Sequence, residues 1–206
     1  MYEPRTYRDW IQDKDLVSFS IIVKETDLHI RARRDLTAAA LEATRRYRAD
    51  LESYIKSHPI FLTTLKPFDV EQDAPPIVIE MADATREVGV GPMAAVAGAI
   101  AERVGTELLP YSDEVIVENG GDIFMKTSKQ RSIGVYAGES AFTKKIAFSI
   151  MPEETPLGVC TSSGTVGHSL SFGYADAVIV FSPSTSLADA AATAIGNRVR
   201  MADEDR

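Results

Sequence analysis

Asp189 and Thr193 stand four residues apart near the end of the chain, a spacing that places both side chains on one face of a helix. A carboxylate and a hydroxyl are oxygen ligands of the kind that Mg²⁺ takes in proteins. The same region also has a structural interpretation, because Ser186 and Asp189 have the spacing of a helix capping box. A magnesium site and a helix cap therefore both stay open.

Residues 155–175 contain no Asp, Glu, Lys or Arg, although 25% of the chain is charged. The segment is rich in glycine and hydroxyl residues, whose backbone N–H groups and side chains can bind phosphate oxygens. A flexible surface loop is the alternative, but such loops usually carry charge. We expect the segment to face a ligand through Thr161, Ser162, Ser163, Gly164 and Thr165, with Gly164 and Gly167 allowing close approach.

Two further residues of this segment have side chains suited to chemistry. His168 is its only histidine, and an ordinary pKa near neutrality makes it the candidate general acid or base. A hydrogen-bonded structural histidine is the alternative. Cys160 is the single cysteine of the chain and has small or apolar neighbours, so we expect a buried apolar residue rather than a reactive thiol.

A tight turn is indicated at Asn119-Gly120-Gly121-Asp122, which separates two apolar runs. Asn-Gly in that position is a strong hairpin signal. The functional alternative is that the second glycine leaves bare backbone beside a ligand, with Asp122 next to it.

The elements that must position these residues form runs of strands separated by helices, which predicts an α+β layered domain with a mostly antiparallel sheet. Residues 66–76 carry three prolines and are the best candidate for a linker. The expected strands are 17–23, 28–33, 77–80, 115–118, 122–126, 133–136, 145–150 and 177–181, and the expected helices are 35–57, 91–104 and 186–198.

Three motifs occur in a characteristic order: Val117-Glu118-Asn119-Gly120-Gly121-Asp122-Ile123, Thr161-Ser162-Ser163-Gly164 and Ala188-Asp189-Ala190-Ala191-Ala192-Thr193-Ala194. They resemble the Asn-x-Gly-Gly-Asp/Glu turn, the Thr-Ser-Gly segment and the Ala-Asp-Ala-x-x-Thr helix start of the ApbE superfamily of flavin transferases. The resemblance covers residues 88–198 and is greatest to an uncharacterised cytoplasmic branch from bacteria and archaea.

The resemblance implies one ApbE-like, T-fold-related domain over residues 1–206, with a hairpin and helix in 17–66 and the motifs in 77–200. It implies that Asp189 and Thr193 bind Mg²⁺, and that the Gly-Gly turn and the Thr-Ser-Gly segment line a site for FAD or FMN.

Two features of the family are missing from this sequence. Its Gly-Gly-Ile-Ala-Lys-Gly stretch is replaced by Gly91-Pro92-Met93-Ala94-Ala95, which lacks the lysine, and its His-x-x-Asp-Pro-Arg-Thr-Gly motif is absent. Two functions therefore stay open. One is a Mg²⁺-dependent enzyme that transfers FMN or cleaves a nucleotide pyrophosphate, and the other is a non-catalytic small-molecule-binding protein.

The charge balance, 22 Lys and Arg against 30 Asp and Glu for a net −8, argues against nucleic acid or an anionic membrane as partner. Six arginines nevertheless gather early in the chain, where a solvated face is the simpler interpretation and a local anion site the alternative. They are Arg31, Arg33, Arg34, Arg45, Arg46 and Arg48.

The first residues are charged and show no apolar signal-peptide region, so we expect a cytoplasmic protein. Its expected partner is a small phosphorylated ligand, and association with a second copy of the chain stays open.

Overall fold

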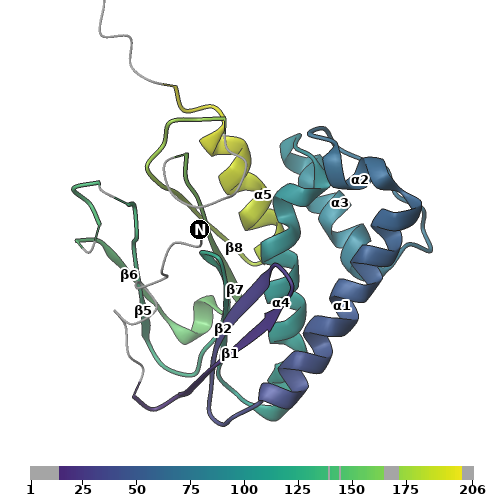
Figure 1. The fold of residues 1–206 in the computed structure, drawn as a ribbon. Helices are drawn as coiled ribbons and strands as arrows, with labels where there is room; N and C mark the ends of the chain where they lie inside the picture. Colours follow the sequence, from purple (N-terminus) through teal and green to yellow (C-terminus); the bar gives the residue numbers. More distant parts are fainter. Residues whose placement is uncertain (1–13, 139, 144, 165–171, 201–206) are drawn as a thin grey trace, which may run out of the picture.

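A layer of helices covers one face of a six-stranded antiparallel sheet in the computed structural model, which describes residues 14–138, 140–143, 145–164 and 172–200 (Figure 1). The strands lie in the order β1-β2-β3-β4-β7-β8. Their bounds are β1 (Val17–Val23), β2 (Thr26–Ala32), β3 (Val115–Asn119), β4 (Asp122–Lys126), β7 (Leu157–Ser162) and β8 (Val178–Ser182). The remaining strands, β5 (Arg131–Gly134) and β6 (Ala147–Ile150), form a separate two-stranded sheet on the side away from the helices (Figure 1).

The α-helices in the described part of the chain are α1 (Thr37–Ser57), α2 (Pro59–Thr63), α3 (Pro76–Val88), α4 (Val96–Leu108) and α5 (Thr185–Gly196), and a short 3-10 helix, η2 (Pro92–Ala95), leads into α4. Helices α4 and α5 pack on the sheet and on each other, while α1 covers α4 and the β1 edge, and α3 packs against α5. Among the described residues, no helix combines the length and the apolar character needed to cross a bilayer.

The main core lies between the helices and the sheet. Along β2, Leu28, Ile30 and Ala32 are fully buried and alternate with half-buried residues, as expected for a strand with one covered face. Helix α4 lies directly on Phe124 of β4, since a Cβ at Gly105 would come within 2.1 Å of the Phe124 ring. A glycine is therefore required for α4 to approach the sheet this closely.

The predicted α+β class and mostly antiparallel sheet are confirmed. The strand predicted at 77–80 is wrong, because these residues form the first turns of α3. Ile77, Val78 and Ile79 are β-branched, which favours a strand locally. The apolar residues continue at helical spacing through Met81 and Ala84, however, and burying that longer stripe outweighs the local preference.

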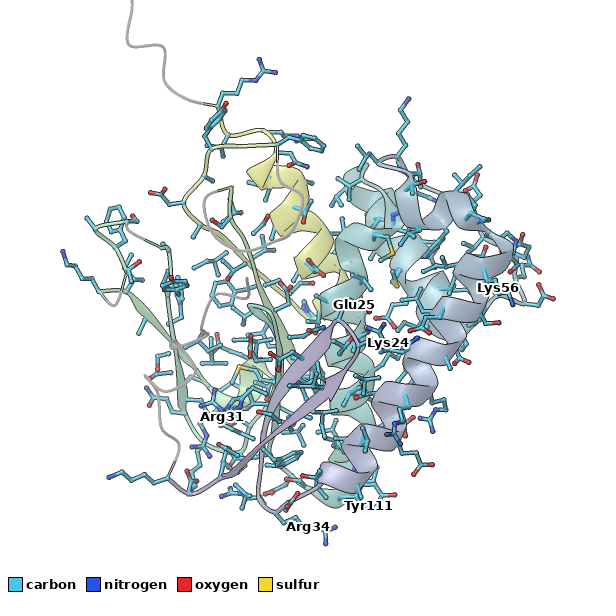
Figure 2. All side chains as sticks on the ribbon, in the orientation of Figure 1. Lys24, Glu25, Arg31, Arg34, Lys56 and Tyr111 are labelled. Carbon is cyan, nitrogen blue, oxygen red and sulfur yellow. The ribbon has the colours of Figure 1, made fainter. Side chains whose placement is uncertain are left out.

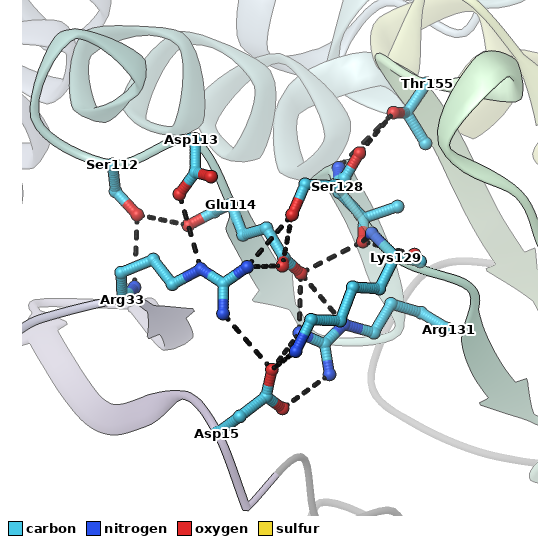
Figure 3. Close-up of polar contacts among 10 residues, drawn as sticks. Asp15, Arg33, Ser112, Asp113, Glu114, Ser128, Lys129, Arg131 and Thr155 are labelled. Carbon is cyan, nitrogen blue, oxygen red and sulfur yellow. Dashed lines mark hydrogen bonds and ion pairs between the residues drawn. The ribbon is translucent and has the colours of Figure 1, made fainter.

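A buried carboxylate joins the six-stranded sheet to the two-stranded sheet (Figure 3). Glu114 is fully buried and accepts hydrogen bonds from Arg131 of β5, at 2.9 Å from Nε and 2.6 Å from Nη2. Arg33, which follows β2, pairs with the other oxygen of Glu114, and Asp15 accepts from both arginines. Burial acts to raise the pKa of Glu114, but hydrogen bonds from Ser128, Arg131 and Thr127 outweigh it and hold the pKa below its ordinary value.

We predict that Glu114→Ala destabilises the protein by about 3–5 kcal/mol, because the substitution leaves Arg131, whose side chain is 7% exposed, without its buried partner. Asp113→Ala is the matched control. The Asp113 side chain is 68% exposed and also pairs with Arg33, so its loss should cost less than about 1 kcal/mol. Urea denaturation of both variants measures the difference, and equal losses would contradict the prediction.

A truncated chain that begins at Lys66 should not fold cooperatively. It lacks α1, which covers α4, and it lacks β2, which pairs with β3 from Leu28 opposite Asn119 to Ala32 opposite Val115. Near-ultraviolet circular dichroism during urea titration tests this expectation. A cooperative transition at the midpoint of the full chain would show instead that the two parts of the chain are separate domains.

Candidate functional site

Two aspartates meet between α5 and the sheet. Asp122, the first residue of β4, is buried, and Asp189 of α5 is half-buried. Burial, and then repulsion by Asp189, raises the pKa of Asp122 well above its ordinary value. Burial also raises the pKa of Asp189 to about 7, although the backbone N–H groups of Gly98 and Ala97 oppose this change. Such a pair is stabilised by a shared proton or by a cation.

Asp189 binds the N-terminus of the neighbouring helix. Its Oδ2 accepts a hydrogen bond at 2.9 Å from the N–H of Gly98, the third residue of α4. That N–H group has no partner within α4, and the positive end of the helix dipole lies there. A Cβ at Gly98 would lie 2.5 Å from the carbonyl oxygen of Thr185, so glycine is needed for this close helix contact.

The helix cap of α5 differs from the one that the sequence indicated. Ser184 is the N-cap, and its side chain accepts a hydrogen bond from the N–H of Leu187 at 3.2 Å. Asp189 therefore caps α4 rather than its own helix, and Ser186 is not part of a capping box with it. Thr193 lies one turn beyond Asp189 on α5 and is half-buried, so the two predicted metal ligands do follow one another along the helix.

The predicted turn is confirmed as a hairpin between β3 and β4, in which Asn119 lies opposite Asp122. Gly120 and Gly121 have φ values of 69° and 107°, a backbone conformation that favours glycine. The side-chain amide of Asn119 donates to the carbonyl oxygen of Ala97 at 3.1 Å. This bond fixes the turn beside the N-terminus of α4, where Asp189 binds.

The uncharged segment begins with a strand that the sequence did not indicate. Residues 157–162 form β7, which lies between β4 and β8. Its lack of charge therefore reflects burial as well as any contact with a ligand. Thr161, near the end of β7, lies beside the paired aspartates, and its N–H donates a hydrogen bond to Oδ1 of Asp122 at 3.3 Å.

Gly164, which follows β7 in the uncharged segment, packs against residues 173–175 of the same segment. The N–H of Gly164 donates to the carbonyl oxygen of Ala175 at 2.9 Å, and a Cβ at Gly164 would lie 2.0 Å from the carbonyl oxygen of Gly173. Gly164 is thus needed for internal packing, and its expected contact with a ligand stays a prediction. Thr165, Gly167 and His168 lie outside the described residues.

Cys160 is a buried free thiol, as predicted. Its Sγ donates to the carbonyl oxygen of Thr185 at 3.4 Å. Burial raises the pKa of the thiol, and the charges of Asp122 and Asp189 raise it further. The thiol therefore stays protonated and is not a nucleophile at neutral pH.

The structure brings together one residue from each motif: Asp122 of the turn, Thr161 of β7 and Asp189 of α5. Asn119, Gly120 and Gly121 belong to the same turn, Ser162 ends β7 and Ser163 follows it, and Thr193 lies one turn beyond Asp189. Over the part of the chain that the structure describes, no three His, Cys, Asp or Glu side chains form a metal-binding cluster. A cation here would complete its coordination with hydroxyl, backbone, water or ligand oxygens.

Four of the six arginines expected as a solvated face or an anion site pair with groups within the protein: Arg33, Arg34, Arg46 and Arg48. Arg33 pairs with Asp113 and Glu114, Arg46 pairs with Glu107 at 2.7 Å, and Arg48 pairs with Glu25 and Glu52. Figure 2 shows Glu25 at the tip of the β1–β2 hairpin and Arg34 beside Tyr111, whose carbonyl oxygen accepts from the Arg34 Nε at 3.0 Å. These contacts fit the simpler interpretation of a charged surface.

Comparison with known proteins agrees with the predicted resemblance. The fold is similar to the apo flavinyl transferase ApbE of Pseudomonas stutzeri, with a TM-score of 0.59 and 12% identity over 87% of this chain and 83% of that one. It is also similar to a mutant of the flavin transferase ApbE from Vibrio cholerae, with a TM-score of 0.54 and 15% identity over 87% and 85% of the two chains.

Archaeal relatives are closer in sequence. UPF0280 protein MJ1526 of Methanocaldococcus jannaschii is 48% identical over 188 residues, which cover 90% of this chain and 76% of that protein. A UPF0280 protein of Methanococcus vannielii is 46% identical over 89% of this chain and 76% of its own length. Residues 8–205 match the family described as AbpE bacteria, and the chain belongs to this family, a branch of the ApbE-like superfamily.

Proposed function

We propose that this protein binds FAD, or a related nucleotide, together with Mg²⁺ and acts on the nucleotide as a flavin-transferase-like enzyme. The observation that carries the proposal is the pair Asp122 and Asp189, two interacting carboxyl groups that backbone N–H groups of Thr161 and Gly98 hold at the junction of β4, α4 and α5, and whose pKa values are raised. Buried acidic groups with shifted pKa values gather at functional sites. The similarity in fold to flavin transferases supports the choice of ligand.

The residues of the site fit a magnesium ion. Two carboxylates carry two negative charges when ionised, which a divalent cation balances, and Thr193 adds a hydroxyl one turn beyond Asp189. The Gly98 N–H orients the Asp189 carboxylate before any ion binds. Mg²⁺ prefers oxygen ligands and keeps room for phosphate oxygens and water. When bound, it would neutralise phosphate charge and polarise the phosphorus centre.

The polar groups beside this pair suit a phosphate-bearing ligand. Gly120 is exposed, and Thr161, Ser162 and Ser163 are half-buried at the same end of the sheet. The hydroxyl groups of Thr161, Ser162 and Ser163 can donate hydrogen bonds without adding negative charge. Neutral donors matter in a chain of net charge −8, because the turn also holds the buried Glu118, whose carboxylate accepts a hydrogen bond from the Gly121 N–H at 2.9 Å.

A non-catalytic binding protein on the same fold is the second candidate. It is favoured by the replacement of the lysine-containing stretch with Gly91-Pro92-Met93-Ala94-Ala95 and by the missing Asp-Pro-Arg-Thr-Gly motif. Incubation with FAD and Mg²⁺, followed by chromatography for AMP, separates the two candidates. AMP release supports the enzyme, whereas saturable binding with intact FAD supports the binding protein.

We predict that Asp189→Asn weakens Mg²⁺-dependent binding of FAD at least tenfold, because the amide keeps the size of the side chain but loses the charge that binds the cation. Calorimetric titrations of FAD, FMN and ADP in Mg²⁺ and in EDTA measure the effect. Asp176→Asn, a change at an exposed aspartate before β8, is the matched control and should bind as the unchanged protein does. If none of the three nucleotides binds, the nucleotide proposal is wrong. If Asp189→Asn binds normally in Mg²⁺, Asp189 serves only as the cap of α4.

Asp189→Asn should also reduce the pH dependence of stability in EDTA. The pKa of Asp189 rises from 3.8 to about 7 on folding, so its contribution to stability is full below about pH 4 and is lost as the pH rises through about 7. Unfolding free energies should fall more steeply with pH in the unchanged protein, by up to about 1.4 kcal/mol per pH unit for one proton. Urea denaturation between pH 4.5 and 7.5 tests this, and parallel pH profiles for the two proteins would contradict it.

A further inference from the structure

Helices α4 and α5 cap one another. Asp189 of α5 binds the Gly98 N–H near the start of α4, and Glu102 of α4 binds the start of α5 in return. Oε2 of Glu102 accepts hydrogen bonds from the N–H groups of Thr185 at 2.7 Å and Ser186 at 3.3 Å. Gly98 and Glu102 are one turn apart on α4, as Thr185 and Asp189 are on α5. The antiparallel helices are therefore joined at two successive turns.

A third helix supports the same contact. Glu80 of α3 accepts a hydrogen bond from the Ser186 hydroxyl and another from Nε of Arg103 at 2.6 Å. Thr185 and Ser186 are fully buried. The first turn of α5 is thus held from α3 and from α4 by carboxylates that do not belong to the paired aspartates.

The same turn is packed closely by backbone on two sides. A Cβ at Gly98 of α4 would lie 2.5 Å from the carbonyl oxygen of Thr185. A Cβ at Gly158 of β7 would lie 2.4 Å from the Cα of the same Thr185. Backbone therefore packs on backbone from two sides. Asp189 lies one turn later on the same helix, so the place of this turn bears on the place of Asp189.

We propose that Glu102 is a positioning residue for the cation and nucleotide site: through its hydrogen bonds to the first turn of α5, it sets the place of Asp189 against Asp122. The inference rests on the proposed function. Glu102 itself touches neither aspartate in the contacts described above and acts through the backbone of α5. A cap with a purely structural role would change stability but leave the metal dependence of binding unaltered.

Three substitutions at position 102 test the proposal in calorimetric titrations of FAD, with Mg²⁺ and with EDTA. Glu102→Ala should weaken Mg²⁺-dependent binding at least tenfold, raise the Mg²⁺ concentration for half-saturation and leave binding in EDTA unchanged. Glu102→Gln should stay within about threefold of the unchanged protein, because its amide oxygen still accepts from both N–H groups. Glu102→Asp keeps the charge on a shorter side chain, and its affinity for FAD in Mg²⁺ should lie between those of the alanine and glutamine variants. This variant preserves the test if the alanine variant does not fold.

Glu107→Ala is the matched control, since Glu107 lies on the same helix and pairs with Tyr47 and Arg46 away from α5. It should bind FAD as the unchanged protein does. Normal Mg²⁺-dependent binding by folded Glu102→Ala, or equal losses in the alanine and glutamine variants, would overturn the proposal.

Amide hydrogen exchange without ligand separates failure of this proposal from failure of the proposed function. Glu102→Ala should speed exchange at residues 185–189, and Glu107→Ala should not. If the unchanged protein shows no Mg²⁺-dependent binding while this exchange difference is present, the proposed function fails and the positioning of α5 by Glu102 is supported. If Glu102→Ala leaves exchange at 185–189 unchanged, the positioning proposal fails whatever the ligand is.

Discussion

The hydrogen bonds that α4 and α5 exchange through Gly98, Asp189, Glu102 and Thr185 are the constraint on which the helical layer depends. The first N–H groups of a helix have no partner within it, and leaving them unpaired in a buried place is costly. Each helix here uses a carboxylate of the other. This exchange of caps requires the two helices to be antiparallel and fixes their register. The close contact of their backbones in turn requires glycine at Gly98.

Two buried acidic sites in this protein illustrate opposite ways of accommodating negative charge. Glu114 lies among Arg33, Arg131 and hydroxyl groups, and its pKa is lowered (Figure 3). Asp122 and Asp189 receive backbone N–H bonds but repel each other, and their pKa values are raised. The first arrangement is complete within the protein and supports a structural role. The second leaves negative charge to be balanced, which is why a site is proposed there and not at Glu114.

Local sequence patterns predicted the elements whose stability is local. The β1–β2 hairpin and α1 follow from alternation and from apolar residues at helical spacing, and both are found close to their expected bounds. The strand β7 was not indicated, because Gly158 does not favour a strand and the place of β7 between β4 and β8 depends on distant partners. At residues 77–80 the local preference gave the wrong element, since packing of the whole helix face decided the structure.

The motif order led to Asp189, Thr193 and the Asn119-Gly120-Gly121-Asp122 turn, but not to the residues that support them. Gly98 and Asp189 are 91 positions apart, and Glu102 and Thr185 are 83 apart, so no spacing in the sequence links them. The small residues of the helix expected at 91–104 fit both close approach of another backbone or a ligand and simple burial between two layers. Only the packing of α4 against α5 and Phe124 shows which of its glycines are needed for close approach.

The position of Cys160 has a practical consequence. The only cysteine of the chain lies on β7 beneath the first turn of α5, with its thiol hydrogen-bonded to the Thr185 carbonyl oxygen. A thiol buried in this way can meet a reagent in solution only when α5 moves away from the sheet, an opening that is local rather than a complete unfolding. The protein therefore carries a natural chemical reporter at the contact between helix and sheet, and its labelling rate follows how often that contact opens.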